Sequence, residues 1–166
     1  MNTWQRIKHL FEDDVGEFPD IVVEDVSSEQ IIVIYEWLMM QCGVAHDPKL
    51  WSFKRKGNAS IHEIYHPERE VGRGRFEDFL HYLSGLCVCD VELPDFAVAV
   101  EEDILALDYK AGAGWNETKV LALFELLRQV QKLAPSARIF QTYEGGCRPN
   151  IEFSEEFNAY CQKHDS

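Results

Sequence analysis

Two long stretches of this sequence contain no lysine or arginine. Residues 11–36 hold nine acidic residues and residues 87–108 hold seven more, whereas seven basic residues gather between positions 49 and 75. The formal net charge is −13. An acidic field of this size repels nucleic acid and anionic lipid, and it accelerates encounter with basic proteins. We therefore expect a basic protein as the partner, with solubility as the alternative reason for the acidic charge, and neither nucleic acid nor a membrane.

The sequence also lacks the long apolar runs of membrane proteins and secreted precursors. No stretch approaches the roughly 20 apolar residues that cross a bilayer. The first twenty residues carry acidic side chains where a secretory signal would have its apolar segment. The five cysteines are an odd number without a disulfide-framework spacing, which is typical of reduced thiols. These features predict a cytoplasmic protein.

No internal repeat, low-complexity tract or glycine- and proline-rich linker divides the chain. Its 166 residues are enough for one hydrophobic core and too few for two comfortable ones. We expect residues 1–166 to form a single α+β domain, with a mixed or mostly antiparallel sheet of about five to six strands covered by helices.

Helix signals are clearest at two places. Ser27 and Gln30 form a capping box ahead of an apolar stripe that runs to Gly43. Asn116 precedes the strongest amphipathic pattern, which ends at Pro135. Shorter helices are expected after Thr3, from Ser154, and over residues 76–83, where Phe76, Phe79, Leu80 and Leu83 show helical spacing before Gly85.

Strands are predicted from alternation and turn residues. Residues 96–100 and 105–109 alternate on either side of an acidic turn, which indicates an antiparallel hairpin. A second hairpin is expected from residues 50–54 and 59–65, which flank Gly57 and Asn58. Residues 20–26 and 138–143 also have strand composition.

One string resembles a catalytic signature. Residues 62–66 read His-Glu-Ile-Tyr-His, which is similar to the H-E-x-x-H motif of the zincin metallopeptidases. The resemblance implies that His62 and His66 are zinc ligands and that Glu63 is the general base. Pro67 disfavours a helical conformation at His66, whereas the zincin motif lies within a helix. We therefore interpret the string as a chance match and keep zinc hydrolysis as the alternative.

Other catalytic motifs are missing. The sequence has no Walker A loop, G-x-S-x-G elbow or EF-hand spacing. Gly112 and Gly114 imitate part of a dinucleotide-binding turn, but Glu117 stands where the third glycine would be and would repel phosphate. We expect no catalytic residue, no metal and no cofactor.

The preferred hypothesis is an acidic inhibitor of a basic protein. In general character the chain resembles immunity proteins, which neutralise bacterial toxins such as nucleases, because it is small, very acidic and without catalytic motifs. The resemblance implies occlusion of a basic toxin surface by carboxylates. Trp115, which precedes a helix in a glycine-rich loop, is expected to stay partly exposed. An adaptor subunit of a larger assembly remains a further alternative. The predicted partner-binding residues are Glu12, Asp13, Asp14, Glu17, Asp20, Glu101, Glu102, Asp103 and Trp115.

Overall fold

The computed structural model describes residues 2–13, 16, 18–42, 44–45, 49–143, 146 and 148–165. Its centre is a six-stranded sheet whose paired strands all run antiparallel, in the order β10-β1-β9-β8-β5-β2. These strands are β1 (Asp20–Glu24), β2 (Val44–Ala45), β5 (Phe79–Ser84), β8 (Phe96–Val100), β9 (Leu105–Tyr109) and β10 (Arg138–Thr142). The predicted α+β class with a mostly antiparallel sheet is confirmed.

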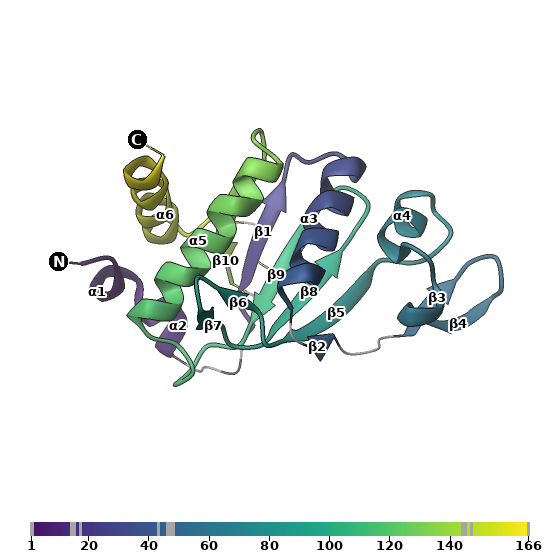
Figure 1. The fold of residues 1–166 in the computed structure, drawn as a ribbon, viewed down its shortest axis with the longest axis horizontal. Coiled ribbons are helices and arrows are strands. Elements are labelled where there is room, and N and C mark those ends of the chain that lie inside the picture. The colour runs from purple at the N-terminus through teal and green to yellow at the C-terminus, as the bar shows by residue number, and fades with distance from the viewer. Residues whose placement is uncertain are drawn as a thin grey trace.

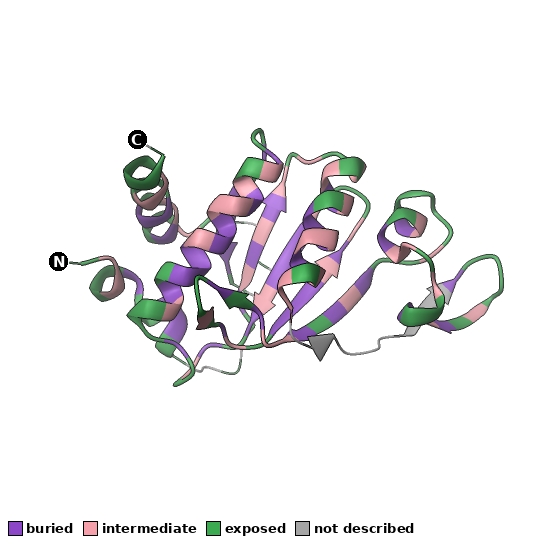
Figure 2. Cartoon of the chain, in the orientation of Figure 1, coloured by how far each residue is buried: buried purple, intermediate pink, exposed green. Residues whose placement is uncertain are grey.

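Two long helices, α3 (Ser28–Gln41) and α5 (Glu117–Leu133), cross the same face of the sheet (Figure 1). Both begin where the sequence indicated. Ser27 and Gln30 form a complete capping box on α3, and the side chain of Asn116 accepts a hydrogen bond from the Lys119 amide at the start of α5. The apolar stripes of both helices face the strands, so the purple, buried parts of Figure 2 concentrate between the two layers.

The remaining helices lie at the two ends of this layer. At one end, α1 (Thr3–Ile7), α2 (His9–Glu12) and α6 (Ile151–His164) pack beside α5, with α6 also contacting β10. At the other end lie the hairpin of β3 (Lys49–Ser52) and β4 (Gly57–Ser60), the 3-10 turn η1 (Ile61–Glu63) and α4 (Pro67–Gly72) (Figure 1). A short hairpin of β6 (Cys87–Val88) and β7 (Val91–Glu92) packs under α5.

The helix-facing side of the sheet is apolar except at two positions in one cross-strand row. That row runs Gln141, Ile21, Leu107, Val98, His81. Gln141 donates to the hydroxyl of Tyr109, which donates to the Leu10 carbonyl. His81 is bonded to the hydroxyl of Tyr35. The sheet therefore carries one buried polar position near each of its lateral edges.

The structure corrects two sequence predictions and adds a helix that was not predicted. Residues 79–84 form strand β5 instead of a helix, because Phe79, His81 and Leu83 alternate toward the core. The predicted second strand of the 50–65 hairpin stops at Ser60, where the chain enters η1. Helix α4, which begins with Pro67 at its first turn, was not predicted. No described helix is long and apolar enough to cross a membrane.

Candidate functional site

The predicted acidic residues fall into two groups at opposite ends of β9. Asp20 pairs with Asp108 near the end of that strand, and Glu12 and Asp13 lie close by because the Phe11 carbonyl accepts a bond from the Gly112 amide. Glu101, Glu102 and Asp103 form the turn that precedes Leu105, at the other end. Asp14 and Glu17 lie outside the described residues. The acids that were predicted to act together therefore do not form one patch.

The turn between β8 and β9 gathers carboxylates that have no basic partner among the described residues. Burial raises the pKa of Glu101, and repulsion from Asp78 and Asp103 raises it further. Glu102 and Asp103 are exposed. The Ser28 hydroxyl donates to the Glu102 carbonyl, which places this turn beside the first turn of α3 and its Glu29. We call Asp78, Glu101, Glu102 and Asp103 the acidic turn.

Several carboxylates elsewhere are compensated by basic or hydrogen-bonding side chains. Glu125 accepts bonds from Arg128, Gln129 and Tyr160, and the first of these holds its pKa down at about 2. Glu24 pairs with Arg138 at 2.6 Å, and Glu70 pairs with both Arg73 and Arg75. Three exposed bases, Lys54, Arg55 and Lys56, lie in the β3–β4 turn at the far end of the long axis (Figure 1). Acidic and basic side chains are thus separated, with the acidic turn between β8 and β9 and the exposed bases between β3 and β4.

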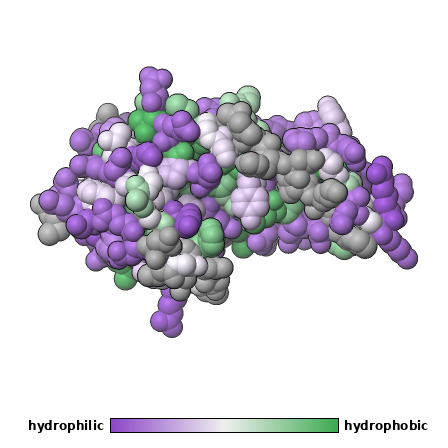
Figure 3. Space-filling model, turned by 90° about the horizontal axis from the view of Figure 1, so that it is seen from below, coloured by the Kyte–Doolittle hydropathy of each residue, from purple (hydrophilic) through white to green (hydrophobic). Residues whose placement is uncertain are grey.

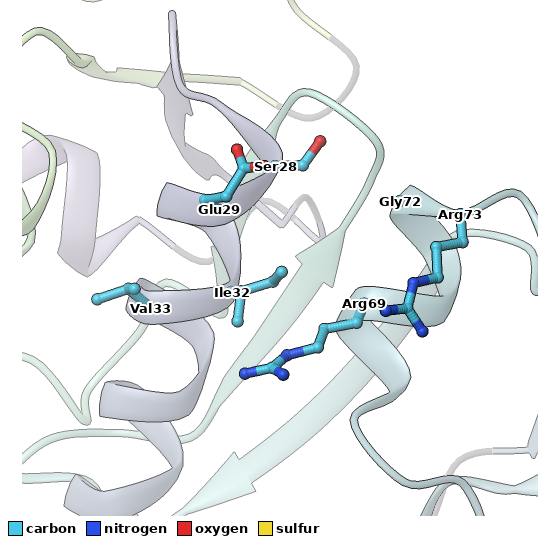
Figure 4. A pocket seen from close by; sticks show the side chains of 7 residues that line it. All are labelled: Ser28, Glu29, Ile32, Val33, Arg69, Gly72 and Arg73. Atoms are coloured by element: carbon cyan, nitrogen blue, oxygen red, sulfur yellow. The ribbon is translucent and has the colours of Figure 1, made fainter.

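Beside the acidic turn, a pocket of about 500 Å³ opens between α3 and α4. Figure 4 shows Ser28 and Glu29 on the first turn of α3 and Arg69 reaching from α4 toward Ile32. Val33, which also lines the pocket, is 46% exposed. A hollow that combines the apolar Ile32 and Val33 with charges of both signs is suited to receiving a side chain of a protein partner.

A second pocket, of about 430 Å³, lies between α3, η1, α4 and β5. Its ionisable lining residues come from four elements: Tyr35 and Glu36, His62, His66 and Glu68, and His81. His66 Nδ1 lies 2.9 Å from Glu36 Oε1 and 3.1 Å from Glu68 Oε1. Burial raises the pKa of Glu68, whose side chain is 2% exposed, and the nearby Glu36 adds to the rise. We call Glu36, His66 and Glu68 the carboxylate–histidine cluster.

The zincin arrangement is absent from this pocket. Ile61–Glu63 forms a 3-10 turn, and His66 adopts a left-handed conformation (φ 54°) as the residue before α4. His62 and His66 do line the same pocket, but Glu63 lines a different one. Glu63, the general base of the zincin motif, therefore does not line the pocket that holds the two histidines, and the hydrolase geometry implied by the resemblance is not formed.

Trp115 does not have the exposure expected of it. Its side chain is 4% exposed and stacks among Phe11, Phe96 and Tyr109, and its indole donates to the Lys110 carbonyl. It belongs to the core. Neither Glu36 nor Glu68 was predicted to be a site residue, because 31 residues separate them and only the packing of α4 on α3 brings them together.

Comparison with known proteins finds a likeness in fold. No family model matches the sequence, and no match is found among curated proteins. The structure is similar to a chain of the crystal structure of the toxic C-terminal tip of CdiA from Pseudomonas aeruginosa in complex with its immune protein. The TM-score is 0.52 at 12% identity, over 75% of this chain and 84% of that chain. A T6SS protein of Pseudomonas aeruginosa gives a TM-score of 0.39 at 12% identity, over 85% of this chain and 48% of that one, which is too weak to support an argument.

Proposed function

We propose that this protein is an immunity protein, an inhibitor that binds a toxin and occludes a basic surface of it. The observation that carries the proposal is the acidic turn, whose carboxylates have no basic partner among the residues that the structure describes. Burial, and then repulsion from Asp78 and Asp103, raises the pKa of Glu101. Such groups repel one another until a cation approaches, so an arginine or lysine from a partner would stabilise them. The likeness to a chain from a complex between a toxin and its immune protein supports the same class of function.

The interface that follows from this proposal combines charge with an apolar anchor. Glu101, Glu102 and Asp103 steer a basic partner toward this end of the sheet. The hollow beside them, with the exposed Val33, accepts an apolar or aromatic side chain at its centre. Arg69 and Arg73 border the hollow on the α4 side, where they would reject a partner that is basic throughout and so add specificity.

The proposal is tested by capture followed by neutralisation. The tagged protein is incubated with host lysate at low and at high salt, and the retained partner is identified, purified and expressed alone and together with this chain. A partner that is toxic alone and harmless in the presence of this protein is the expected result. A stoichiometric partner without toxic activity would contradict the immunity function.

A matched pair of variants then tests the surface. Glu101→Gln/Glu102→Gln/Asp103→Asn removes three charges from the acidic turn, and Asp90→Asn/Glu92→Gln/Asp95→Asn removes three exposed charges from the region of the β6–β7 hairpin. We expect the first variant to slow association with the captured toxin by at least about tenfold at low salt and the second by less than about twofold. Equal effects would show that only net charge matters. A further variant, Glu12→Gln/Asp13→Asn, tests the acidic group at the other end of β9.

A further inference from the structure

A second site lies apart from the acidic turn, in the pocket formed by α3, η1, α4 and β5. One atom from each of Glu36, His66 and Glu68 lies within 4.8 Å of the other two. In a tetrahedral site with metal–ligand distances of about 2.0–2.2 Å, the ligand atoms lie roughly 3.3–3.6 Å apart. The separations of 2.9 and 3.1 Å from His66 Nδ1 to the two carboxylates are close to that spacing. Small side-chain movements would admit an ion.

Glu36 Oε1 is a buried atom that no donor approaches with hydrogen-bond geometry, although His66 Nδ1 is near. The hydrogen-bond contact of His66 Nδ1 is with Glu68. Glu68, at 2% exposure, is a second carboxylate held away from solvent. Two shielded carboxylate oxygens therefore converge on one imidazole nitrogen, and buried carboxylates are stable only where positive charge or hydrogen bonds compensate them.

We propose that Glu36, His66 and Glu68 bind one divalent transition-metal ion, Zn²⁺ or an ion of similar chemistry, which fastens α4 to α3. The imidazole ligand favours a transition metal over Ca²⁺ or Mg²⁺, which take six or more oxygen ligands. All three residues line the pocket of about 430 Å³, which leaves space for a solvent molecule to complete the coordination. The three ligands are distinct from the residues of the acidic turn, although Arg69, which borders the hollow of the proposed toxin interface, lies 3.5 Å from Glu36 Oε1.

Two neighbouring groups tune this site. Arg69 Nη2 lies 3.5 Å from Glu36 Oε1 and competes with a cation for that carboxylate, but its side chain is 44% exposed and can turn outward. Tyr35 and His81, which also line the pocket, form a buried hydrogen bond of 2.8 Å. Burial raises the pKa of Tyr35, and the negative charge of Glu68 raises it further. The pair fixes the rear wall of the pocket and leaves the three ligands directed at one point.

The test titrates Zn²⁺ into the chelator-treated chain of 166 residues by calorimetry, with metal content measured after dialysis. Cys87→Ser/Cys89→Ser serves as the background, because these exposed thiols could bind zinc by themselves. We expect one ion per chain, and a loss of affinity of at least about tenfold for each of Glu36→Gln, His66→Ala and Glu68→Gln. Circular dichroism in metal-free buffer shows which variants remain folded. A folded chain without saturable binding would overturn the proposal.

Two further measurements distinguish this site from adventitious binding. His9→Ala/Glu152→Gln removes an exposed histidine–glutamate pair 3.3 Å apart on the other side of the molecule and should leave the affinity unchanged. Arg69→Gln should tighten binding several-fold, because it removes a competing positive charge. Co²⁺ bound at the site should give a spectrum without the charge-transfer band of a thiolate ligand. Loss of binding in the His9 variant, or weaker binding in Arg69→Gln, would contradict the assignment.

Discussion

The two ends of the helical layer are built on different principles. Around α5 and α6 the interior is aromatic, with Phe11 stacked between Tyr109 and Trp115, and the carboxylate of Glu125 is fully matched by donors. Around α3 and α4 the interior holds Tyr35, His81 and Glu68, which are ionisable groups in positions that apolar side chains could fill. Burying ionisable groups gives up stability that apolar packing would provide. The difference is in keeping with the metal site that we propose at the second end.

The face seen in Figure 3 agrees with a division between a packed interior and a charged exterior. Hydrophilic side chains predominate there, and the hydrophobic ones form small separate patches. A partner that approached this face would therefore meet mostly hydrophilic side chains.

The largest expected effect comes from the aromatic end. Phe11→Ala removes a side chain with 0% exposure and leaves a cavity between Tyr109 and Trp115. We expect it to lower the free energy of unfolding by about 3–5 kcal/mol, measured by urea denaturation. Tyr65→Ala, at a side chain with 87% exposure, is the control and should change it by less than about 0.5 kcal/mol. Similar losses in the two variants would remove the basis for the comparison.

A smaller loss is expected at the polar end. Tyr35→Phe deletes the hydroxyl that is bonded to His81 Nδ1 at 2.8 Å and leaves a buried ring nitrogen without its partner. The free energy of unfolding should fall by about 1–3 kcal/mol. Tyr82→Phe, on an exposed side chain of the neighbouring strand position, should be neutral. If Tyr35→Phe were also neutral, the Tyr35–His81 bond would contribute nothing to this wall of the pocket.

The matched carboxylate at the aromatic end should make stability depend on pH. Arg128, together with Gln129 and Tyr160, lowers the folded-state pKa of Glu125 from 4.5 to about 2. Its contribution is therefore present above about pH 4.5 and is lost as the pH falls toward 2. Glu125→Gln should lower the free energy of unfolding by about 1 kcal/mol at neutral pH, after allowance for solvent screening. The gap between variant and wild type should close in acid, whereas Glu155→Gln, at an exposed pair with Arg6, should open no such gap.

The smallest effect has the opposite sign. Because the folded-state pKa of Glu101 is raised, its ionised form opposes folding above that pKa. Glu101→Gln should therefore stabilise the protein at neutral pH, by less than about 1 kcal/mol, and the gain should vanish as the pH falls below the ordinary value of 4.5. Added salt should reduce the gain. A loss of stability on this substitution would mean that the acidic turn is not self-repelling.

Local signals in the sequence accounted for most of the elements. The Ser27–Gln30 box and Asn116 place two helix starts, and alternation around Glu101–Asp103 gives the β8–β9 hairpin. The helix predicted over residues 76–83 was wrong. The apolar residues that have helical spacing also fit a strand in which Phe79 and Leu83 are buried and Tyr82 is exposed, and only pairing with β8 decides between helix and strand. Helix α4 is six residues long, too short for its period to be read.

The candidate sites were less accessible to sequence analysis. The charge pattern located the acidic turn, but not its separation from Glu12 and Asp13, which depends on strand register. The H-E-x-x-H string drew attention to His66 for the wrong reason. Its partners, Glu36 and Glu68, carry no local signal, since one is an ordinary acid on a helix and the other lies in an unpredicted one.

Strand β1 lies between β9 and β10, so both of its neighbours come from far along the chain. During synthesis the meander of β5, β8 and β9 can pair early, but β1 must wait for Arg138–Thr142 before its second edge is covered. Until then Ile21 and Val23, which are both fully buried in the folded protein, remain partly exposed to solvent. Chains truncated before β10 should therefore be prone to aggregation, and folding of the sheet should be completed only after β10 has been synthesised.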